Sequence, residues 1–456
     1  MGFVSCLCNR WMKKGMPIVA ALMAVVPPAG AAGEREVFWG TPSYSYGERF
    51  VSPAGLSEMG VTYMGHLVYW NRWETARDRW DDNYIAQMLQ RMEAMARAGM
   101  RNGIRLGEAH PGAREWKTIR NKPYQGRNKN AYPGEEDTDD RYFAYLRKLV
   151  RTFRGKVCYY VLGDEIDMLF DASFRNEGRL REYGAFFEQA ARAIREEDPS
   201  AAIVVAPFAW GYPESNLKLL HDWGYTKDAD GIALNISHID CADPAYLQGI
   251  GEAIRRISPR YRLFSNGFGY VSDRLPEACQ ARRLAHIMLV AWEAGFSYLP
   301  YYLPASNAHP WSSGLYRVNL QNGGIDPRQA VTPFRLLSGT LARRPEIQEN
   351  RLTIESIVTP FGERRLEEMD IPKPVVYWNG SAESGFGIVR TGRMNSPLQL
   401  QARLLLRQTA PRGAVLVAVN SVNGERLVLE TTQGNGGTVF SVTISNEPLI
   451  LRWETL

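Results

Sequence analysis

Short apolar runs and amphipathic segments alternate along the chain from residue 60 to about 345. Apolar residues that recur every three or four positions predict helices, and continuous apolar runs bounded by turn residues predict buried strands. We expect seven or eight parallel βα units, which favour a closed (β/α)8 TIM barrel over an open sheet. The expected helices are 83–100, 141–153, 183–197, 219–223, 247–257 and 278–294, and the expected strands are 61–70, 103–106, 157–162, 201–207, 231–237, 261–264 and 296–302.

The pattern changes to strict alternation after about residue 354. Residues 398–402 alternate apolar and polar side chains, and 414–419 form another β-rich run. Asn423-Gly424 and the glycine-rich segment 434–437 have the composition of hairpin turns. These signals predict a small antiparallel β-sandwich after the barrel. The expected domains are a secretory signal peptide over 1–31, the barrel over 34–345 and the sandwich over 346–456.

The first 31 residues have the composition of an export signal. Basic residues, including Lys13 and Lys14, precede the apolar segment 16–26, and Ala29-Gly30-Ala31 matches an A-x-A cleavage site. We therefore expect the protein to be exported to the periplasm or the extracellular space. Removal of this segment takes away three positive charges, which lowers the formal net charge from +5 to +2.

The mature chain offers few signs of partners other than a small or polymeric substrate. Its small net charge argues against nucleic acid as a partner. No later segment approaches the ~20 apolar residues that span a bilayer, so we expect no membrane insertion of the mature chain. The sequence leaves the oligomeric state open. His110 lies near Glu108 without a visible third ligand, so no metal site and no cofactor are expected.

Residues 157–167 consist of an expected apolar strand followed by three acidic residues, Asp164, Glu165 and Asp167. Barrel enzymes place their chemistry where such strands end. This position makes Glu165 the leading candidate for a general acid. A solvated acidic turn is the alternative.

These segments together resemble the retaining glycoside hydrolases of clan A, whose (β/α)8 barrels often carry a C-terminal β-sandwich. Residues 142–167 resemble the family's "F-x-G-x-V-x-Y-W-x-x-x-N-E-P" strand, with Glu165 at the position of the acid/base. Residues 183–207 resemble its "A-I-K-x-x-D-P-x-A-x-I-x-x-P" unit. Residues 230–238 resemble the sixth strand, which commonly ends in a substrate-facing histidine, here His238. The resemblance implies a carbohydrate substrate and a glycosidase.

The seventh strand departs from the family pattern. Clan members read approximately "L-W-V-T-E-F-G-Y" there, and the glutamate is the nucleophile, whereas residues 263–270 read L-F-S-N-G-F-G-Y. Gly267 occupies the expected nucleophile position and Asn266 precedes it. In the fourth strand, Asp164 replaces the usual asparagine and Ile166 the usual proline. The standard retaining mechanism, with one glutamate on the fourth strand and one on the seventh, is therefore not expected.

Substrate-assisted catalysis would account for the missing glutamate, because the substrate's 2-acetamido oxygen then attacks the anomeric carbon. Asp164 would orient the acetamido group and Glu165 would protonate the leaving oxygen. An adjacent Asp-Glu pair after the fourth strand resembles the N-acetylhexosaminidase families. Because neighbouring residues of a regular strand point to opposite faces, this mechanism needs an irregular strand end.

Two alternatives to substrate assistance stay open at this point. Another carboxylate, Glu108 after the second expected strand or Asp240 after the sixth, could complete the site, including an inverting site with ~6.5–9.5 Å between the two acids. The chain could instead be an inactive pseudo-glycosidase that only binds carbohydrate. An engineered glycosynthase would carry the same glycine at the nucleophile position.

The remaining candidates for substrate binding are polar or aromatic residues near strand ends, where ring faces stack on sugars and polar groups bond hydroxyls. Arg105 is expected at the barrel rim, where its charge keeps a carboxylate ionised. For each of these side chains the alternative to substrate binding is packing in the protein core. The set comprises His66, Arg105, Glu108, Trp210, His238, Asn266, Tyr270, Tyr302 and Trp311, with Trp70, Trp73, Trp292 and Tyr301 as weaker members.

Overall fold

A computed structural model gives the fold of the chain, and Gly33–Leu456 forms one compact unit in it. Among the described helices, none is long and apolar enough to cross a bilayer. The structure describes residues 35–43, 51–76, 78–108, 138–163, 177–208, 213–236, 244–267, 276–301, 305–306, 314–319, 321–322, 324–344, 347–348, 351–360, 362–369, 371, 373–381, 385–392, 399–434 and 436–455.

Eight parallel strands close into a barrel in the order β10-β11-β2-β3-β6-β7-β8-β9. The predicted (β/α)8 fold is confirmed. In chain order the barrel strands are β2 (Phe38–Ser43), β3 (Tyr63–Tyr69), β6 (Arg101–Glu108), β7 (Tyr159–Leu162), β8 (Ala202–Val205), β9 (Gly231–Asn235), β10 (Arg262–Gly267) and β11 (Phe296–Pro300).

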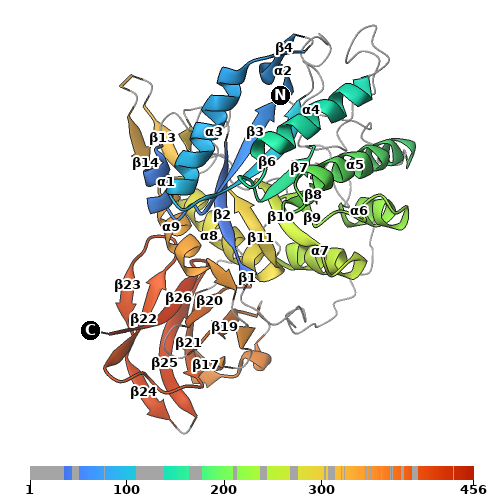
Figure 1. Cartoon of the computed structure of the whole chain (residues 1–456). Coiled ribbons are helices and arrows are strands. Elements are labelled where there is room, and N and C mark those ends of the chain that lie inside the picture. The colour runs from blue at the N-terminus through green and yellow to red at the C-terminus, as the bar shows by residue number, and fades with distance from the viewer. Residues whose placement is uncertain are drawn as a thin grey trace, which may run out of the picture. The chain divides into compact units, whose positions relative to one another are not determined.

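Helices surround the barrel on its outside (Figure 1). In α3, Asp81 caps the first turn by accepting hydrogen bonds from the backbone N–H groups of Asn83 and Tyr84, and a row of buried methionines and Ile85 faces the core. The helices are α1 (Pro53–Glu58), α2 (Trp70–Trp73), α3 (Asp82–Arg97), α4 (Thr138–Phe153), α5 (Glu177–Glu197), α6 (Pro213–Asp222), α7 (Pro244–Ile257), α8 (Glu277–Ala294) and α9 (Val331–Thr340). The short strands outside the barrel are β1 (Arg35–Glu36), β4 (Glu74–Ala76), β5 (Arg79–Trp80), β12 (Ala305–Ser306), β13 (Tyr316–Val318), β14 (Ile325–Pro327) and β15 (Arg343–Arg344).

The first barrel strand, β2, was missed by the sequence analysis. Its six residues include Gly40 and Pro42, which interrupt the apolar pattern that marks a buried strand. The expected first strand at 61–70 is therefore the second barrel strand, β3, and Glu108 ends the third strand rather than the second. β7 is the fourth barrel strand and β10 is the seventh.

Aromatic rings fill the barrel interior. Tyr63, Tyr159, Phe264 and Tyr298 form a buried cluster with small aliphatic residues, and the rings of Phe264 and Tyr298 stack at 4.6 Å. A Cβ atom at Gly103 would lie 2.4 Å from the ring of Tyr159, so only glycine lets β6 approach this ring. The interior is a packed core rather than a channel.

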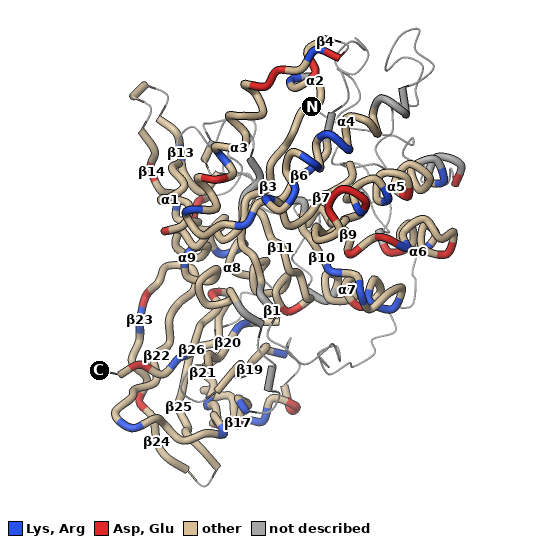
Figure 2. The backbone as a smooth tube through the Cα atoms, viewed as in Figure 1, with Lys and Arg blue, Asp and Glu red and all other residues tan. Residues whose placement is uncertain are grey.

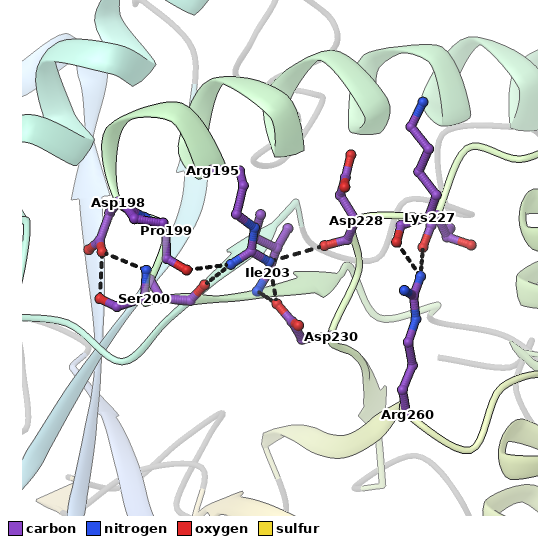
Figure 3. Close-up of polar contacts among 11 residues, drawn as sticks. Arg195, Asp198, Pro199, Ser200, Ile203, Lys227, Asp228, Asp230 and Arg260 are labelled. Atoms are coloured by element: carbon purple, nitrogen blue, oxygen red, sulfur yellow. Dashed lines mark hydrogen bonds and ion pairs between the residues drawn. The ribbon is translucent and has the colours of Figure 1, made fainter.

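Arg195 fastens the amino-terminal ends of β8 and β9 to the end of α5 (Figure 3). Its guanidinium donates to the carbonyls of Pro199 and Ala201 and to the Asp230 carboxylate at 2.7 Å. The same carboxylate accepts the backbone N–H of Ile203 at 2.8 Å. This face of a barrel contributes to stability, while the opposite face carries chemistry.

Charges of both signs lie together along the outer helices α5 and α6 (Figure 2). Lys218 pairs with Asp222 at 2.6 Å on α6, and Lys227 reaches Glu188 of α5 at 2.8 Å. Three of these side chains are about half exposed or more and Glu188 is partly exposed, so each pair adds little to stability.

The C-terminal part is an antiparallel β-sandwich. Its sheets have the orders β16-β19-β20-β26-β22-β23 and β18-β17-β21-β25-β24. Both predicted hairpin turns are present, since Asn423-Gly424 joins β22 to β23 and Gly434 pairs with Gly437 across the β24–β25 turn. The elements are β16 (Ile347–Gln348), β17 (Leu352–Thr359), β18 (Gly362–Arg364), the 3-10 helix η7 (Leu366–Glu368), β19 (Val375–Asn379), β20 (Phe386–Arg390), β21 (Leu400–Leu406), β22 (Ala414–Asn420), β23 (Arg426–Val428), β24 (Thr431–Gly434), β25 (Gly437–Ile444) and β26 (Leu449–Thr455).

A buried ion pair joins α8 to the sandwich. Arg390 of β20 donates to both carboxylate oxygens of Glu293, at 3.2 and 2.5 Å, and the Tyr377 hydroxyl donates to the same carboxylate at 3.1 Å. The two charged side chains are only 1% and 5% exposed. Burial alone would lower the pKa of Arg390, but the Glu293 carboxylate outweighs it and raises that pKa. The Glu293 carboxylate is thus the buried counterion of the Arg390 guanidinium.

We expect Glu293→Gln to lower the free energy of unfolding by about 3–5 kcal/mol, because it leaves the Arg390 charge buried without a counterion. Arg403→Met is the control, since it removes an Arg403–Glu355 pair of 3.3 Å that is largely solvated, and should cost less than ~1 kcal/mol. Urea denaturation followed by tryptophan fluorescence measures both. Equal losses for the two variants would contradict the importance assigned to the buried pair.

Candidate active site at the carboxyl ends of the barrel strands

The carboxyl ends of the eight barrel strands meet at one rim, because all the strands are parallel. We call this rim the barrel mouth. Site candidates lie on or after several of these strands, among them the second, third, fourth, sixth and seventh, of which β7 is the fourth and β10 the seventh. Residues that follow these strands therefore start from one face of the barrel.

β7 ends at Leu162 directly before the acidic pair. Its last residues are buried on both faces, as expected for a covered parallel strand. Gly163 follows with φ of +112°, a conformation that side chains rarely adopt. The regular alternation of the strand therefore stops one residue before Asp164. Asp164 and Glu165 themselves lie outside the described residues.

Arg105 lies on the interior face of β6. It pairs in register with Val161, a member of the interior cluster, and its side chain is buried. Burial raises the pKa of the Tyr63 hydroxyl well above its ordinary value, and the charge of Arg105 partly opposes this rise. The structure thus places the Arg105 side chain inside the barrel, with its cation near the Tyr63 hydroxyl. Its expected role in keeping a carboxylate ionised stays a prediction.

The ends of β9 and β10 contribute an amide and a glycine. Asn235 follows the interior residue Ala233 by two positions, is buried and pairs in register with Gly267. The register shifts between Ser265 and Gly267, and the N–H of Gly267 donates to the Ser265 hydroxyl at 3.1 Å. Asn266 lies within this irregularity, and its side chain is outside the described part of the structure.

Asn235 and Tyr69 are site candidates that the sequence analysis did not select. Asn235 is the one polar residue that ends the apolar strand β9, and that change of polarity was the available signal. Tyr69 is half-buried at the end of β3, and the Arg72 guanidinium lies 4.8 Å from its ring centroid. Glu108 pairs with Tyr69 in register after a shift, although the Glu108 side chain is not described.

His66 lies on the outer face of its strand, against the helices. It alternates with the core residues Met64 and Val68, and its Nε2–H donates to Asn102 at 2.8 Å. The Asn102 amide in turn donates to the carbonyl of Met92 in α3. Burial lowers the pKa of His66 to about 4, although the hydrogen bond that its imidazole donates to Asn102 opposes this shift. We therefore leave His66 out of the proposed site.

Several aromatic candidates are core residues. Trp70, Trp73, Trp292 and Tyr301 are fully buried. Trp70 stacks on Tyr145 with ring centroids 5.0 Å apart. Their large apolar rings are used in packing helices against strands, so they do not offer a stacking surface for sugar.

The other predicted site residues are not among those the structure describes. Within the described ranges, no group of three or more histidine, cysteine, aspartate or glutamate side chains could hold a metal ion. The residues that remain predictions are Asp164, Glu165, Trp210, His238, Asp240, Tyr270, Tyr302 and Trp311.

No protein-family model and no curated protein sequence matches the chain. Solved structures do match. A family 39 glycoside hydrolase from the gut symbiont Bacteroides cellulosilyticus WH2 superposes with a TM-score of 0.65 at 15% identity, over 92% of this chain and 81% of that one. The chain therefore shares the (β/α)8 fold of this glycoside hydrolase.

Other glycoside hydrolases share this architecture. A GH30 endoxylanase from Clostridium papyrosolvens C71 has a TM-score of 0.54 at 10% identity and covers 93% of this chain and 98% of its own. GH5_18 from Streptomyces cattleya, solved in complex with GlcNAc, has a TM-score of 0.51 at 12% identity, over 68% of this chain and 81% of its own. At these identities the similarity establishes the fold alone.

The buried neutral imidazole of His66 predicts a loss of stability in acid. Its folded pKa of about 4 lies below the unfolded value of about 6.5, so its contribution is complete above pH 6.5 and is lost as the pH falls toward 4. We expect His66→Gln to reduce this acid destabilisation by up to about 3 kcal/mol. Urea unfolding of both proteins at pH 7, 5.5 and 4.5 measures it. An unchanged pH dependence would contradict the assignment.

Proposed function

We propose that the protein is an exported glycosidase that cleaves O-glycosidic bonds in an oligo- or polysaccharide, with Glu165 as general acid and Asp164 as its partner. The reaction takes place at the barrel mouth. Arg105 and Asn235 supply a buried cation and an amide on the interior side of that rim.

One contrast between two strands carries this proposal. The fourth strand ends at Leu162 and leaves its regular conformation at Gly163, immediately before two acids, while the seventh strand ends in Gly267 and offers no carboxylate. A site with acids on only one of these strands suits a reaction in which the substrate supplies its own nucleophile. The irregularity at Gly163 removes the constraint that adjacent side chains point to opposite faces.

The proposed chemistry proceeds in two steps. The 2-acetamido oxygen of the sugar attacks the anomeric carbon, the glycosidic C–O bond breaks, and Glu165 gives its proton to the leaving oxygen. Asp164 holds the acetamido N–H and balances the positive charge of the cyclic intermediate. Glu165 then removes a proton from water, whose oxygen attacks the anomeric carbon and reopens the ring.

Binding without catalysis is the second candidate function, and Gly267 favours it. A barrel that has lost the carboxylate of its seventh strand would keep its carbohydrate-binding rim. The fold accommodates both functions, so turnover distinguishes them.

Hydrolysis of two aryl β-glycosides, one with a 2-acetamido group and one with a 2-hydroxyl group, tests the proposal. We expect turnover of the acetamido substrate only, and we expect Glu165→Gln and Asp164→Asn each to slow that turnover by about a hundredfold or more. Asp240→Asn is a matched charge-removal control and should retain activity.

Turnover of the hydroxyl substrate that disappears in Glu108→Gln or Asp240→Asn would contradict the substrate-assisted mechanism and favour a second protein carboxylate. No turnover of either substrate, with glycan binding that persists in Glu165→Gln, would favour the binding function.

Export through cleavage after Ala31 forms part of the proposal. The mature protein recovered from the periplasm or medium of an expressing bacterium should begin at Ala32, because the A-x-A site precedes it. Intact-mass measurement checks this. A mass that includes residues 1–31 in the soluble product would contradict it.

A further inference from the structure

The hydroxyl of Tyr183, which no step of the proposed mechanism uses, occupies a particular place in the fold. Tyr183 lies on α5 and is fully buried. Its hydroxyl donates to the carbonyl of Leu162 at 3.1 Å and accepts the backbone N–H of Ala206 at 3.1 Å. These two groups belong to the carboxyl ends of the fourth and fifth barrel strands.

The Tyr183 hydroxyl stands in place of a backbone hydrogen bond of the ladder between β7 and β8. The N–H of Ala202 donates to the carbonyl of Cys158 at 2.9 Å at the start of the two strands. Equivalent bonds recur every two residues in a parallel ladder, and a step of four residues on each strand leads to the N–H of Ala206 and the carbonyl of Leu162. At that rung the Tyr183 hydroxyl bonds both groups. The two strands are thus joined through a side chain where they reach the barrel mouth.

Both strands lead directly into predicted site residues. Glu165 follows Leu162 by three positions, with Asp164 between them, and Trp210 follows Ala206 by four. Buried backbone groups must find partners, so removal of the hydroxyl leaves two of them unsatisfied at this point. The ends of both strands would then adopt a new arrangement.

We propose that Tyr183 is a positioning residue, which sets the location of the general acid by holding the ends of β7 and β8 through its hydroxyl. This inference rests on the proposed function of Glu165. Tyr183 does not touch the substrate. It acts through the backbone that precedes Asp164 and Glu165, and small displacements of a catalytic group cost large factors in rate.

The neighbouring Tyr142 provides a matched control. Its ring also contacts Phe186, with centroids 5.4 Å apart against 6.4 Å for Tyr183 and Phe186. The Tyr142 hydroxyl is equally buried but has no hydrogen-bond partner among the residues that the structure describes. Tyr142→Phe and Tyr183→Phe therefore remove the same atom from one aromatic cluster, and only the second removes hydrogen bonds.

Leaving-group dependence separates a positioning role from a general loss of structure. The 2,4-dinitrophenolate group leaves its glycoside without protonation, whereas the phenolate group of a phenyl glycoside must be protonated by the general acid as it leaves. The sugar is the one that the wild-type protein hydrolyses. We expect Tyr183→Phe to slow hydrolysis of the phenyl glycoside at least tenfold more than hydrolysis of the dinitrophenyl glycoside, with KM within about twofold of the wild-type value. Tyr142→Phe should leave both hydrolysis rates unchanged. Equal slowing of both substrates by an active Tyr183→Phe protein would overturn the positioning role and leave the proposed function intact.

Hydrogen exchange gives a readout that does not need activity. The Ala206 amide should exchange at least tenfold faster in Tyr183→Phe than in the wild type or in Tyr142→Phe, measured on the peptide spanning 203–208. Unchanged exchange would overturn the inference even if hydrolysis were affected. A wild-type protein inert toward all the glycosides would overturn the proposed function and, with it, the role of Tyr183 in positioning the general acid. The exchange result would still decide whether the hydroxyl holds the strand ends.

Discussion

Closure of eight parallel strands into one barrel is the constraint on which the rest of the molecule depends. Closure pairs every barrel strand with two neighbours and brings all eight carboxyl ends to the same rim. The buried aromatic cluster of Tyr63, Tyr159, Phe264 and Tyr298 fills the interior and sets how closely the strands approach. Residues far apart in the sequence, such as Arg105 and Asn235, lie on the interior side of the same barrel for this reason.

The two ends of the barrel are held together by different interactions. At the amino-terminal ends, Arg195 and Asp230 tie helix and strands together through charged hydrogen bonds. At the carboxyl ends the ladder between β7 and β8 gives way to the Tyr183 hydroxyl, and the chain turns away through Gly163. The Arg195–Asp230 contacts make the amino-terminal end of the barrel rigid. The Tyr183 hydroxyl fixes the ends of β7 and β8, so that the loops that follow them start from set positions.

Much of the fold could be predicted because its signals are local. Buried strands with continuous apolar runs, such as β9, and hairpin turns, such as Asn423-Gly424, were identified from composition and spacing. β2 was missed, because its glycine and proline hide a strand that only its neighbours in the barrel stabilise. His66 could not be assigned to a face, since that depends on the register of its strand against β6. Tyr183 gives no local signal either, because its two partners lie on separate strands about twenty residues away.

The central claim is that the first attack on the anomeric carbon comes from the substrate's own acetamido oxygen rather than from water, so that hydrolysis takes two displacements. The anomeric configuration of the first-formed product tests this most directly, by proton NMR early in the hydrolysis of an aryl 2-acetamido-2-deoxy-β-glycoside. Two successive displacements predict a product of retained β configuration. An α product would contradict the account, because it requires direct attack by water at a site with a second protein carboxylate.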